Sequence, residues 1–145
     1  MVLIDSSVLI KGQRNPARFA DIVENRDDLA TCAAAVAEFE VGLYAPREKK
    51  TREQVRDFSE ASLAPLMQLP ILPDDFQTAA RLVGEAIFSS AAKTSLADGL
   101  IAACARRTGR VVWTTDETDF KAMGCETFNP WADSEHPPGE RAAGQ

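Results

Sequence analysis

The stretch that most constrains the fold of this chain is the apolar run Val2-Leu3-Ile4, which stops on Asp5. An apolar run without polar alternation is typical of a strand buried on both faces, as in a parallel sheet. Ser6 and Ser7 follow at once, and because serine is favoured at helix N-caps, a helix is predicted directly after Asp5. Ligands of open α/β sheets bind at the carboxyl ends of the strands. Asp5 is therefore either a site residue or a helix-capping residue, and this segment leaves both interpretations open.

The rest of the chain alternates strand and helix patterns, which predicts an α/β fold around a mostly parallel sheet. Two prolines, Pro70 and Pro73, place one strand at the sheet edge, because proline cannot donate a ladder hydrogen bond. Ser95 and Asp98 have the spacing of a capping box. The predicted strands are 2–4, 29–32, 69–73, 111–115 and 126–128. The predicted helices are 7–12, 16–23, 33–44, 51–66 and 95–105. A further helix is predicted to begin at Asp74 or Asp75, which would cap it.

Length and composition indicate one domain. A chain of 145 residues with 45% hydrophobic residues suits a single core, which we assign to residues 1–131. The polar segment 132–145 is expected to be a disordered tail. Neither a membrane span nor a signal peptide pattern is present, so a cytoplasmic protein is expected. The three cysteines are far apart, which argues against a disulfide framework or a thiolate zinc site.

The chemistry available to the chain is limited by its single histidine, His136, which lies in the polar tail. Hydrolases with a histidine base and histidine-ligated zinc enzymes are therefore disfavoured. The net charge of −6 argues against a general polyanion binder, although basic residues cluster locally at 47–52 and 106–110. Any catalysis should rest on carboxylates, hydroxyls, lysine or arginine.

Four acids occupy comparable places at the predicted carboxyl edge of the sheet: Asp5, Glu38, Asp98 and Asp116. Two carboxylates about 4 Å apart repel by roughly 4 kcal/mol at an effective dielectric near 20, so the group needs protons or cations. Mg²⁺ prefers such oxygen ligands. Taken singly, Asp98 also fits a purely helix-capping role, and Glu38 also fits the role of a surface acid. Asp119 is either a fifth ligand or a turn cap.

The motifs around these acids resemble the PIN-domain family, in particular VapC-like ribonuclease toxins of type II toxin-antitoxin systems. Four segments carry the resemblance in order, and Phe128-Asn129-Pro130-Trp131 is also similar to the end of several relatives. The four segments are Leu3-Ile4-Asp5-Ser6-Ser7-Val8-Leu9-Ile10, Ala37-Glu38-Phe39-Glu40-Val41-Gly42, Ala97-Asp98-Gly99-Leu100-Ile101-Ala102-Ala103 and Thr114-Thr115-Asp116-Glu117-Thr118-Asp119-Phe120. The family often has threonine at Ser6 and alanine at Gly99, and neither departure affects the acids.

The resemblance implies a three-layer α/β/α sandwich, an acidic site for Mg²⁺ or Mn²⁺, and cleavage of RNA. It also implies a homodimer and a small VapB-like antitoxin that blocks the cleft. Asp5, Glu38, Asp98 and Asp116 would hold the metal, and a metal-activated water would attack the phosphodiester.

Residues around the acids are assigned supporting roles. Ser6, Ser7 and Thr115 are expected to orient a ligand or a water, while each of these hydroxyls taken alone also fits a helix-capping role. The expected contacts to the RNA backbone are Lys49, Lys50, Arg52 and Arg106.

Two other functions compete with a nuclease as interpretations of the acids. A haloacid dehalogenase-type phosphotransferase needs a second acid two residues after Asp5, where this chain has Ser7. The alternative that stays open is a non-catalytic binding module whose acidic pocket keeps a vestigial metal site.

Overall fold

The computed structural model describes residues 1–45, 48–90 and 93–132. Its five strands form one all-parallel sheet in the order β3-β2-β1-β4-β5. The strands are β1 (Val2–Ile4), β2 (Leu29–Cys32), β3 (Met67–Leu69), β4 (Val111–Trp113) and β5 (Thr127–Phe128). The helices are α1 (Ser6–Arg14), α2 (Pro16–Val23), α3 (Ala33–Tyr44), α4 (Lys49–Phe58), the π-helical turn η1 (Ser59–Leu63), α5 (Pro73–Ser90), α6 (Leu96–Thr108) and α7 (Glu117–Ala122).

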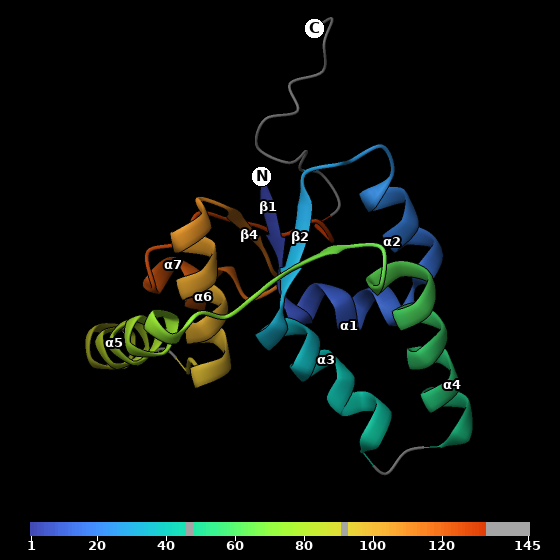
Figure 1. The fold of residues 1–145 in the computed structure, drawn as a ribbon, viewed down its shortest axis with the longest axis horizontal. Helices are drawn as coiled ribbons and strands as arrows, with labels where there is room; N and C mark the ends of the chain where they lie inside the picture. The colour runs from blue at the N-terminus through green and yellow to red at the C-terminus, as the bar shows by residue number, and fades with distance from the viewer. Residues whose placement is uncertain (46–47, 91–92, 133–145) are drawn as a thin grey trace, which may run out of the picture.

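Strand β1 lies at the centre of the sheet, between β2 and β4 (Figure 1). Ile4 is in register with Trp113 of β4, and the backbone N–H of Asp5 donates to the Trp113 carbonyl at 2.9 Å. The residues that follow these strands, Asp5 and Thr114, therefore lie beside each other. The register brings together two positions more than a hundred residues apart in sequence.

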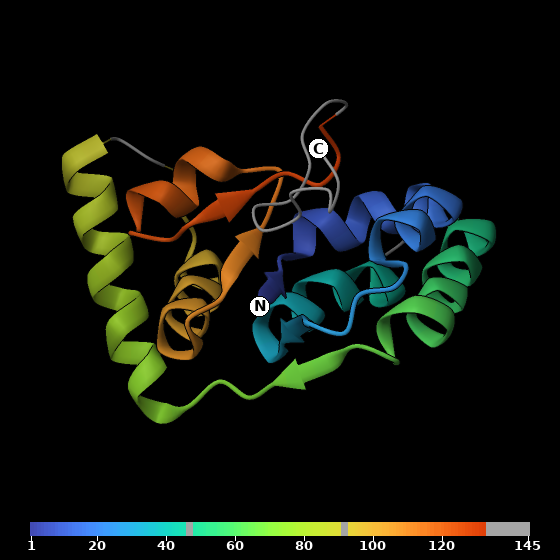
Figure 2. The ribbon, with the colours of Figure 1, turned by 90° about the horizontal axis from the view of Figure 1, so that it is seen from above.

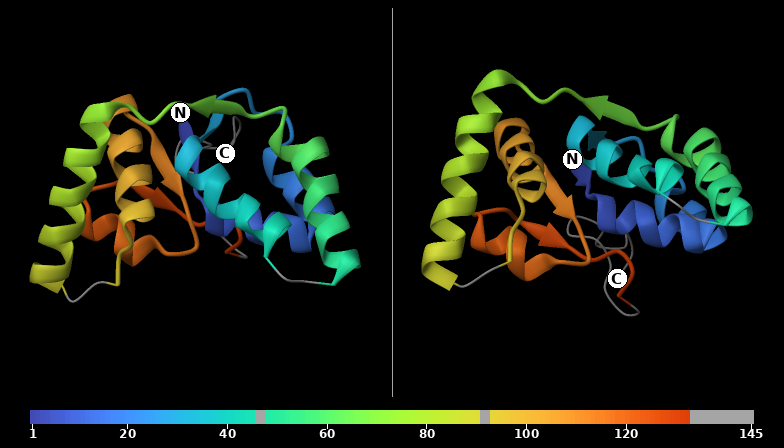
Figure 3. Two further views of the ribbon diagram at one scale, coloured as in Figure 1. Left: turned by 60° about the horizontal axis from the view of Figure 1, so that its bottom comes forward. Right: turned by 90° about the horizontal axis from the view of Figure 1, so that it is seen from below.

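Helices cover both faces of the sheet, so the predicted three-layer α/β/α architecture is confirmed (Figures 2 and 3). Side chains alternate along a strand. Val2 and Ile4 pack into a core with α1, α2 and α4, whereas Leu3 packs into a second core with α5, α6 and α7. Helix α3 contributes to both cores, since Phe39 belongs to the first and Ala35 to the second. The two cores fix α1, α3 and α6 around the end of β1.

Three segment boundaries differ from the sequence prediction. The edge strand ends at Leu69, ahead of Pro70, rather than running over 69–73, because a proline cannot donate to the ladder. The helix predicted at 51–66 begins at Lys49 and ends in the π-helical turn, before Pro65. The first helix continues past Gly12 to Arg14, since Gly12 leaves room for the rings of Phe19 and Phe58.

Other features agree with the prediction or fall outside the described residues. The Ser95–Asp98 capping box is present, and Gly109 ends α6 with a left-handed φ of 65°. Helix α5 extends to Ser90. Residues 91–92 and the predicted tail from residue 133 onward lie outside the described residues. No helix in the described part of the chain is long and apolar enough to cross a bilayer.

Candidate metal centre

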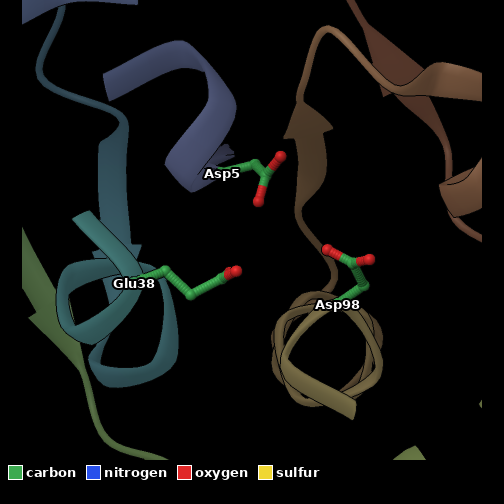
Figure 4. A group of neighbouring side chains, drawn as sticks. All are labelled: Asp5, Glu38 and Asp98. Atoms are coloured by element: carbon green, nitrogen blue, oxygen red, sulfur yellow. The ribbon is translucent and has the colours of Figure 1, made fainter. Parts of the chain in front are cut away.

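Three of the predicted acids meet at the carboxyl end of β1. Asp5 is the N-cap residue of α1, Glu38 lies in the second turn of α3, and Asp98 lies in the first turn of α6. One carboxylate oxygen from each lies within 4.8 Å of the other two. Figure 4 shows the three side chains pointing into one space from three different elements. The predicted convergence is therefore confirmed for Asp5, Glu38 and Asp98.

Asp5 is held by hydroxyl groups and does not cap its helix. Its Oδ2 accepts hydrogen bonds from Ser7 Oγ at 2.8 Å and from Thr114 Oγ1 at 3.0 Å, and its Oδ1 lies 3.4 Å from Ser6 Oγ. No side-chain capping bond runs from Asp5 to the backbone of α1. Of the two interpretations that the sequence left open, the site residue is the one that the geometry favours.

Glu38 and Asp98 are each oriented by a serine. Ser6 Oγ donates to Glu38 Oε1 at 3.1 Å, so one hydroxyl lies between Glu38 and Asp5. Asp98 Oδ2 accepts from the Ser95 backbone N–H at 3.1 Å, while Ser95 Oγ accepts from the Asp98 N–H at 3.1 Å. This capping box uses one oxygen of Asp98, so capping and metal binding are compatible.

Gly99 fixes the position of this helix start against α5. A Cβ at Gly99 would lie 2.5 Å from a methyl group of Val83 and 3.0 Å from the Ala79 carbonyl. Alanine, which the resemblance leads one to expect here, would require the Val83 side chain to shift and would crowd the Ala79 carbonyl. The glycine therefore serves close packing directly beside Asp98.

The electrostatics of the group suit a bound cation. Burial raises the pKa of Asp5, with a further increase from Asp98, although the hydroxyls of Ser7 and Thr114 oppose the shift. Burial also raises the pKa of Glu38, and the charges of Asp5 and Asp98 add to it while the Ser6 hydroxyl opposes it. Carboxylate oxygens that repel one another and lack a basic partner in this set are suitable ligands for Mg²⁺ or Mn²⁺. The donor set thus fits a hard divalent cation.

Asp116 lies beside this group and not within it. It is exposed at the N-cap of α7, and among the described residues it is not one of the three acids whose oxygens lie within 4.8 Å. Burial raises the pKa of Asp116, and Asp119 and Asp98 add to the shift. Asp119 lies in the first turn of α7. A metal-ligand role for Asp116 or Asp119 stays a prediction.

Thr114 is a site residue that the sequence analysis missed. It is fully buried, and its hydroxyl donates to Asp5 and accepts from the Asp116 N–H at 2.9 Å. The predicted Thr115 contributes its backbone N–H, which donates to Ser7 Oγ at 3.0 Å. If the strands before Asp5 and Asp116 are paired in parallel with Ile4 opposite Trp113, the next residues, Asp5 and Thr114, lie beside each other. That pairing is the signal that would have identified Thr114.

The predicted RNA contacts lie apart from the three acids. Lys49, Lys50 and Arg52 are in the first turn of α4, where Lys49 Nζ lies 3.8 Å from Glu53. Arg106 is near the opposite end of α6 from Asp98 and donates to the Met123 carbonyl at 3.0 Å. Their roles in RNA binding stay predictions.

Comparison with known proteins gives consistent matches. The PIN domain family profile matches residues 2–124. Toxin FitB of Neisseria gonorrhoeae is 33% identical over 92% of this chain and 100% of its own length. VapC ribonuclease Y4jK of Sinorhizobium fredii is 33% identical over 90% of this chain and 98% of its own.

Solved structures agree with these sequence matches. The crystal structure of FitAcB from Neisseria gonorrhoeae has a TM-score of 0.73 and 26% identity, covering 92% of this chain and 100% of that one. VapBC-5 of Mycobacterium tuberculosis, described as a member of the VapBC family of toxin-antitoxin systems, has a TM-score of 0.61 and 25% identity, with coverages of 88% and 94%.

Proposed function

Because the chain belongs to the PIN domain family, we propose that it is a metal-dependent endoribonuclease and the toxin of a toxin-antitoxin pair. The observation that carries the proposal is the meeting of Asp5, Glu38 and Asp98 within 4.8 Å. Like-charged groups gathered from three elements would be destabilising without a function that uses their charge. A non-catalytic pocket would have no need for the ordered hydroxyls that orient Asp5 and Glu38.

In this proposal, Asp5, Glu38 and Asp98 bind Mg²⁺ or Mn²⁺, and Asp116 supports Asp98 from the adjacent helix start. Ser6, Ser7 and Thr114 orient the carboxylates so that their free oxygens face the common space. A bound divalent cation would lower the pKa of water and stabilise charge that develops on the phosphodiester. The acids thereby place the scissile phosphate at the carboxyl end of β1.

The test is cleavage of RNA by the purified chain in Mg²⁺ or Mn²⁺. We expect EDTA to abolish cleavage and added metal to restore it. Asp5→Asn should abolish cleavage in either metal, whereas Asp74→Asn, an exposed acid of α5, should leave it unchanged. Cleavage that persists in EDTA would refute the metal mechanism. Absence of cleavage with every metal, in a folded chain that binds a partner through the acidic pocket, would favour the non-catalytic alternative.

We further propose a small cognate antitoxin as the partner, acting in the cytoplasm, where the RNA substrate is located. Support comes from the relatives, which include a protein named as a toxin and a structure described as a toxin-antitoxin system. Co-expression with the product of any short reading frame that lies beside this gene, followed by co-purification, tests the pairing. Toxicity that the neighbouring frame does not relieve would count against it.

A homodimer is the assembly that we propose for the free chain. Helix α5 carries an apolar stripe that lies outside both cores, in which Phe76 is 53% exposed, Ile87 52% and Phe88 95%. Apolar exposure of this kind on one helix marks a protein interface. Light scattering should give a dimer for the wild type and a monomer for Ile87→Asp/Phe88→Asp. A wild-type monomer at all concentrations would rule the dimer out.

A further inference from the structure

Two cavities lie on the side of the molecule where α1 packs against α3 and α4, and the smaller one adjoins the metal centre. The smaller, of about 160 Å³, is lined by Glu38, Gln13 and Arg14. The larger, of about 280 Å³, also has Gln13 and Arg14 in its wall. Because the same two residues line both, the cavities meet at the end of α1, and the smaller one extends from there to the metal centre.

Gln13 is the unusual residue in this wall. Its side chain is only 9% exposed, and its amide forms no hydrogen bond with residues 1–45, 48–90 and 93–132. The amide atoms are not fully enclosed, in contrast to the buried unpaired atoms of Ser59 and Thr94. Gln13 lines both cavities, so its amide donor and acceptor are accessible to a ligand that enters them.

Arg14 is the cation beside this amide. It is the last residue of α1, is exposed, and forms no ion pair in the described part of the chain. The smaller cavity contains one acid, Glu38, whose charge the proposed function assigns to the metal. The guanidinium is therefore available to an anion that enters from the metal centre. A phosphate is the anion that arginine recognises best in the proposed substrate.

We propose that Gln13 and Arg14 form a nucleotide subsite for RNA, an inference that rests on the proposed ribonuclease function. The Gln13 amide hydrogen-bonds the edge of an unstacked base, and Arg14 binds a phosphate next to that base. Asp5 and Gln13 lie on the same helix, and at about 1.5 Å per residue they are about 12 Å apart along its axis. The base that is recognised is therefore close to the scissile bond, and Gln13 determines sequence preference there.

RNA explains both residues better than an inserted segment of a partner protein does. One amide presents a donor and an acceptor, which matches a base edge, and one unpaired arginine matches one phosphate. The larger cavity is also lined by one acid, Asp57, and it adds the apolar surface of Phe58 and Ala61 next to the polar groups, as a base requires. A partner segment is the competing occupant, and the experiment below separates the two.

The experiment uses a pool of single-stranded RNA with a randomised segment, cleaved in Mn²⁺ and sequenced at the new ends. Gln13→Leu should reduce the preference at one position near the cut by about tenfold, the order expected for one lost base contact. Arg14→Ala should raise KM for all sequences alike, and the slope of log affinity against log salt should fall by about 0.7. Gln77→Leu and Arg81→Ala on α5, at the far side of the molecule (Figure 2), are the matched controls and should change neither.

The outcomes distinguish this inference from the proposed function. Wild-type preference and KM in both variants would overturn the subsite while leaving the ribonuclease intact. If the wild type does not cleave the pool, binding of the same RNA to Asp5→Asn, measured by fluorescence anisotropy with and without Arg14→Ala, decides the subsite by itself. Unchanged anisotropy overturns it, and weakened binding supports it. Variants that lose only the complex with the co-expressed antitoxin would assign the cavities to the partner and also overturn it.

Discussion

Asp5 and Asp75 are equally buried acids in opposite surroundings. Asp5 is 2% exposed and Asp75 is 3% exposed. Asp5 is surrounded by hydroxyls and other carboxylates, and its burial raises its pKa. Burial acts on Asp75 in the same direction, but hydrogen bonds from Arg107 and from the Leu72 N–H prevail and lower its pKa. Both acids are shielded from solvent, but only Asp75 has a cationic partner, Arg107, that compensates its charge in the described part of the chain.

The contacts of Asp75 show what a purely structural acid looks like in this fold. Arg107 Nε donates to Asp75 Oδ1 at 3.0 Å and its NH2 group donates to Oδ2 at 3.0 Å, which ties α6 to α5. The same NH2 group donates to the Pro70 carbonyl at 2.9 Å. Within the part of the chain that the structure describes, Asp5 has no such guanidinium partner, so its ionised form needs a cation from solution. The difference indicates that the Asp75 pair stabilises the fold and that the Asp5 group binds a ligand.

The largest expected effect is that of Asp5→Asn. It removes one carboxylate from the metal centre, and losing several kcal/mol of transition-state stabilisation should lower cleavage by about 1,000-fold or more. Because burial disfavours the ionised Asp5, the melting temperature without metal should not fall. RNA cleavage and thermal unfolding in EDTA measure the two effects. A melting temperature of Asp5→Asn far below that of the wild type in EDTA would show that Asp5 is structural, like Asp75.

Asp75→Ala should have the reverse profile. Breaking a buried pair costs about 3–5 kcal/mol, and since Arg107 is partly exposed, we expect a loss of about 2–3 kcal/mol in the free energy of unfolding. Cleavage per folded molecule should be unchanged. Urea denaturation measures the loss, and Asp74→Ala, its exposed neighbour, should be neutral. A stable but inactive Asp75→Ala protein would contradict the division between the two acids.

Thr114→Val tests whether the hydroxyl groups around Asp5 prepare this acid for metal binding. It removes a hydroxyl that orients Asp5 while keeping the shape of the side chain, and losses of about 10–100-fold in metal affinity are typical of such partners. Calorimetric titration with Mn²⁺ measures the change. Thr115→Val is the matched control, because Thr115 reaches the site through its backbone N–H. Equal losses in both variants would show that the hydroxyl position is unimportant.

The smallest effect is the pH dependence of the Asp75 pair. The pKa of Asp75 is lowered on folding from its ordinary value of 3.8, so the folded state favours the ionised form. The stability that this contributes is fully present above pH 3.8 and is lost as the pH falls through the lower, folded pKa. The difference in unfolding free energy between wild type and Asp75→Ala should be constant near neutral pH and shrink below 3.8. A difference that grows on acidification would have the wrong sign.

The acids that lie next to strand ends could be predicted from the sequence. Asp5 follows an apolar run, and Asp98 stands in a capping box, so local patterns alone placed both at the carboxyl edge of the sheet. Glu38 was selected over Glu40 by the family motif, since either acid fitted the helix pattern. The structure confirms these positions because parallel strands bring their carboxyl ends to one edge.

What could not be predicted depends on contacts between distant segments. Thr114 was counted within a strand expected to end at Thr115, whereas its contact with Asp5 follows from the register of Ile4 with Trp113. A local pattern does not specify register between strands so far apart. The burial of Gln13 in the walls of two cavities is likewise a property of the packed structure, because any glutamine near the end of an amphipathic helix looks like a surface residue in sequence.

The central position of β1 has a consequence for biosynthesis. Strand β1 leaves the ribosome well before its neighbour β4, so the contact between Asp5 and Thr114 forms only after β4 has been translated. A nascent chain that has reached the end of α5 carries Asp5 and Glu38 but lacks Asp98. Products that terminate before α6 therefore contain an incomplete site, and the order of synthesis itself delays assembly of the acidic pocket until α6 has been translated.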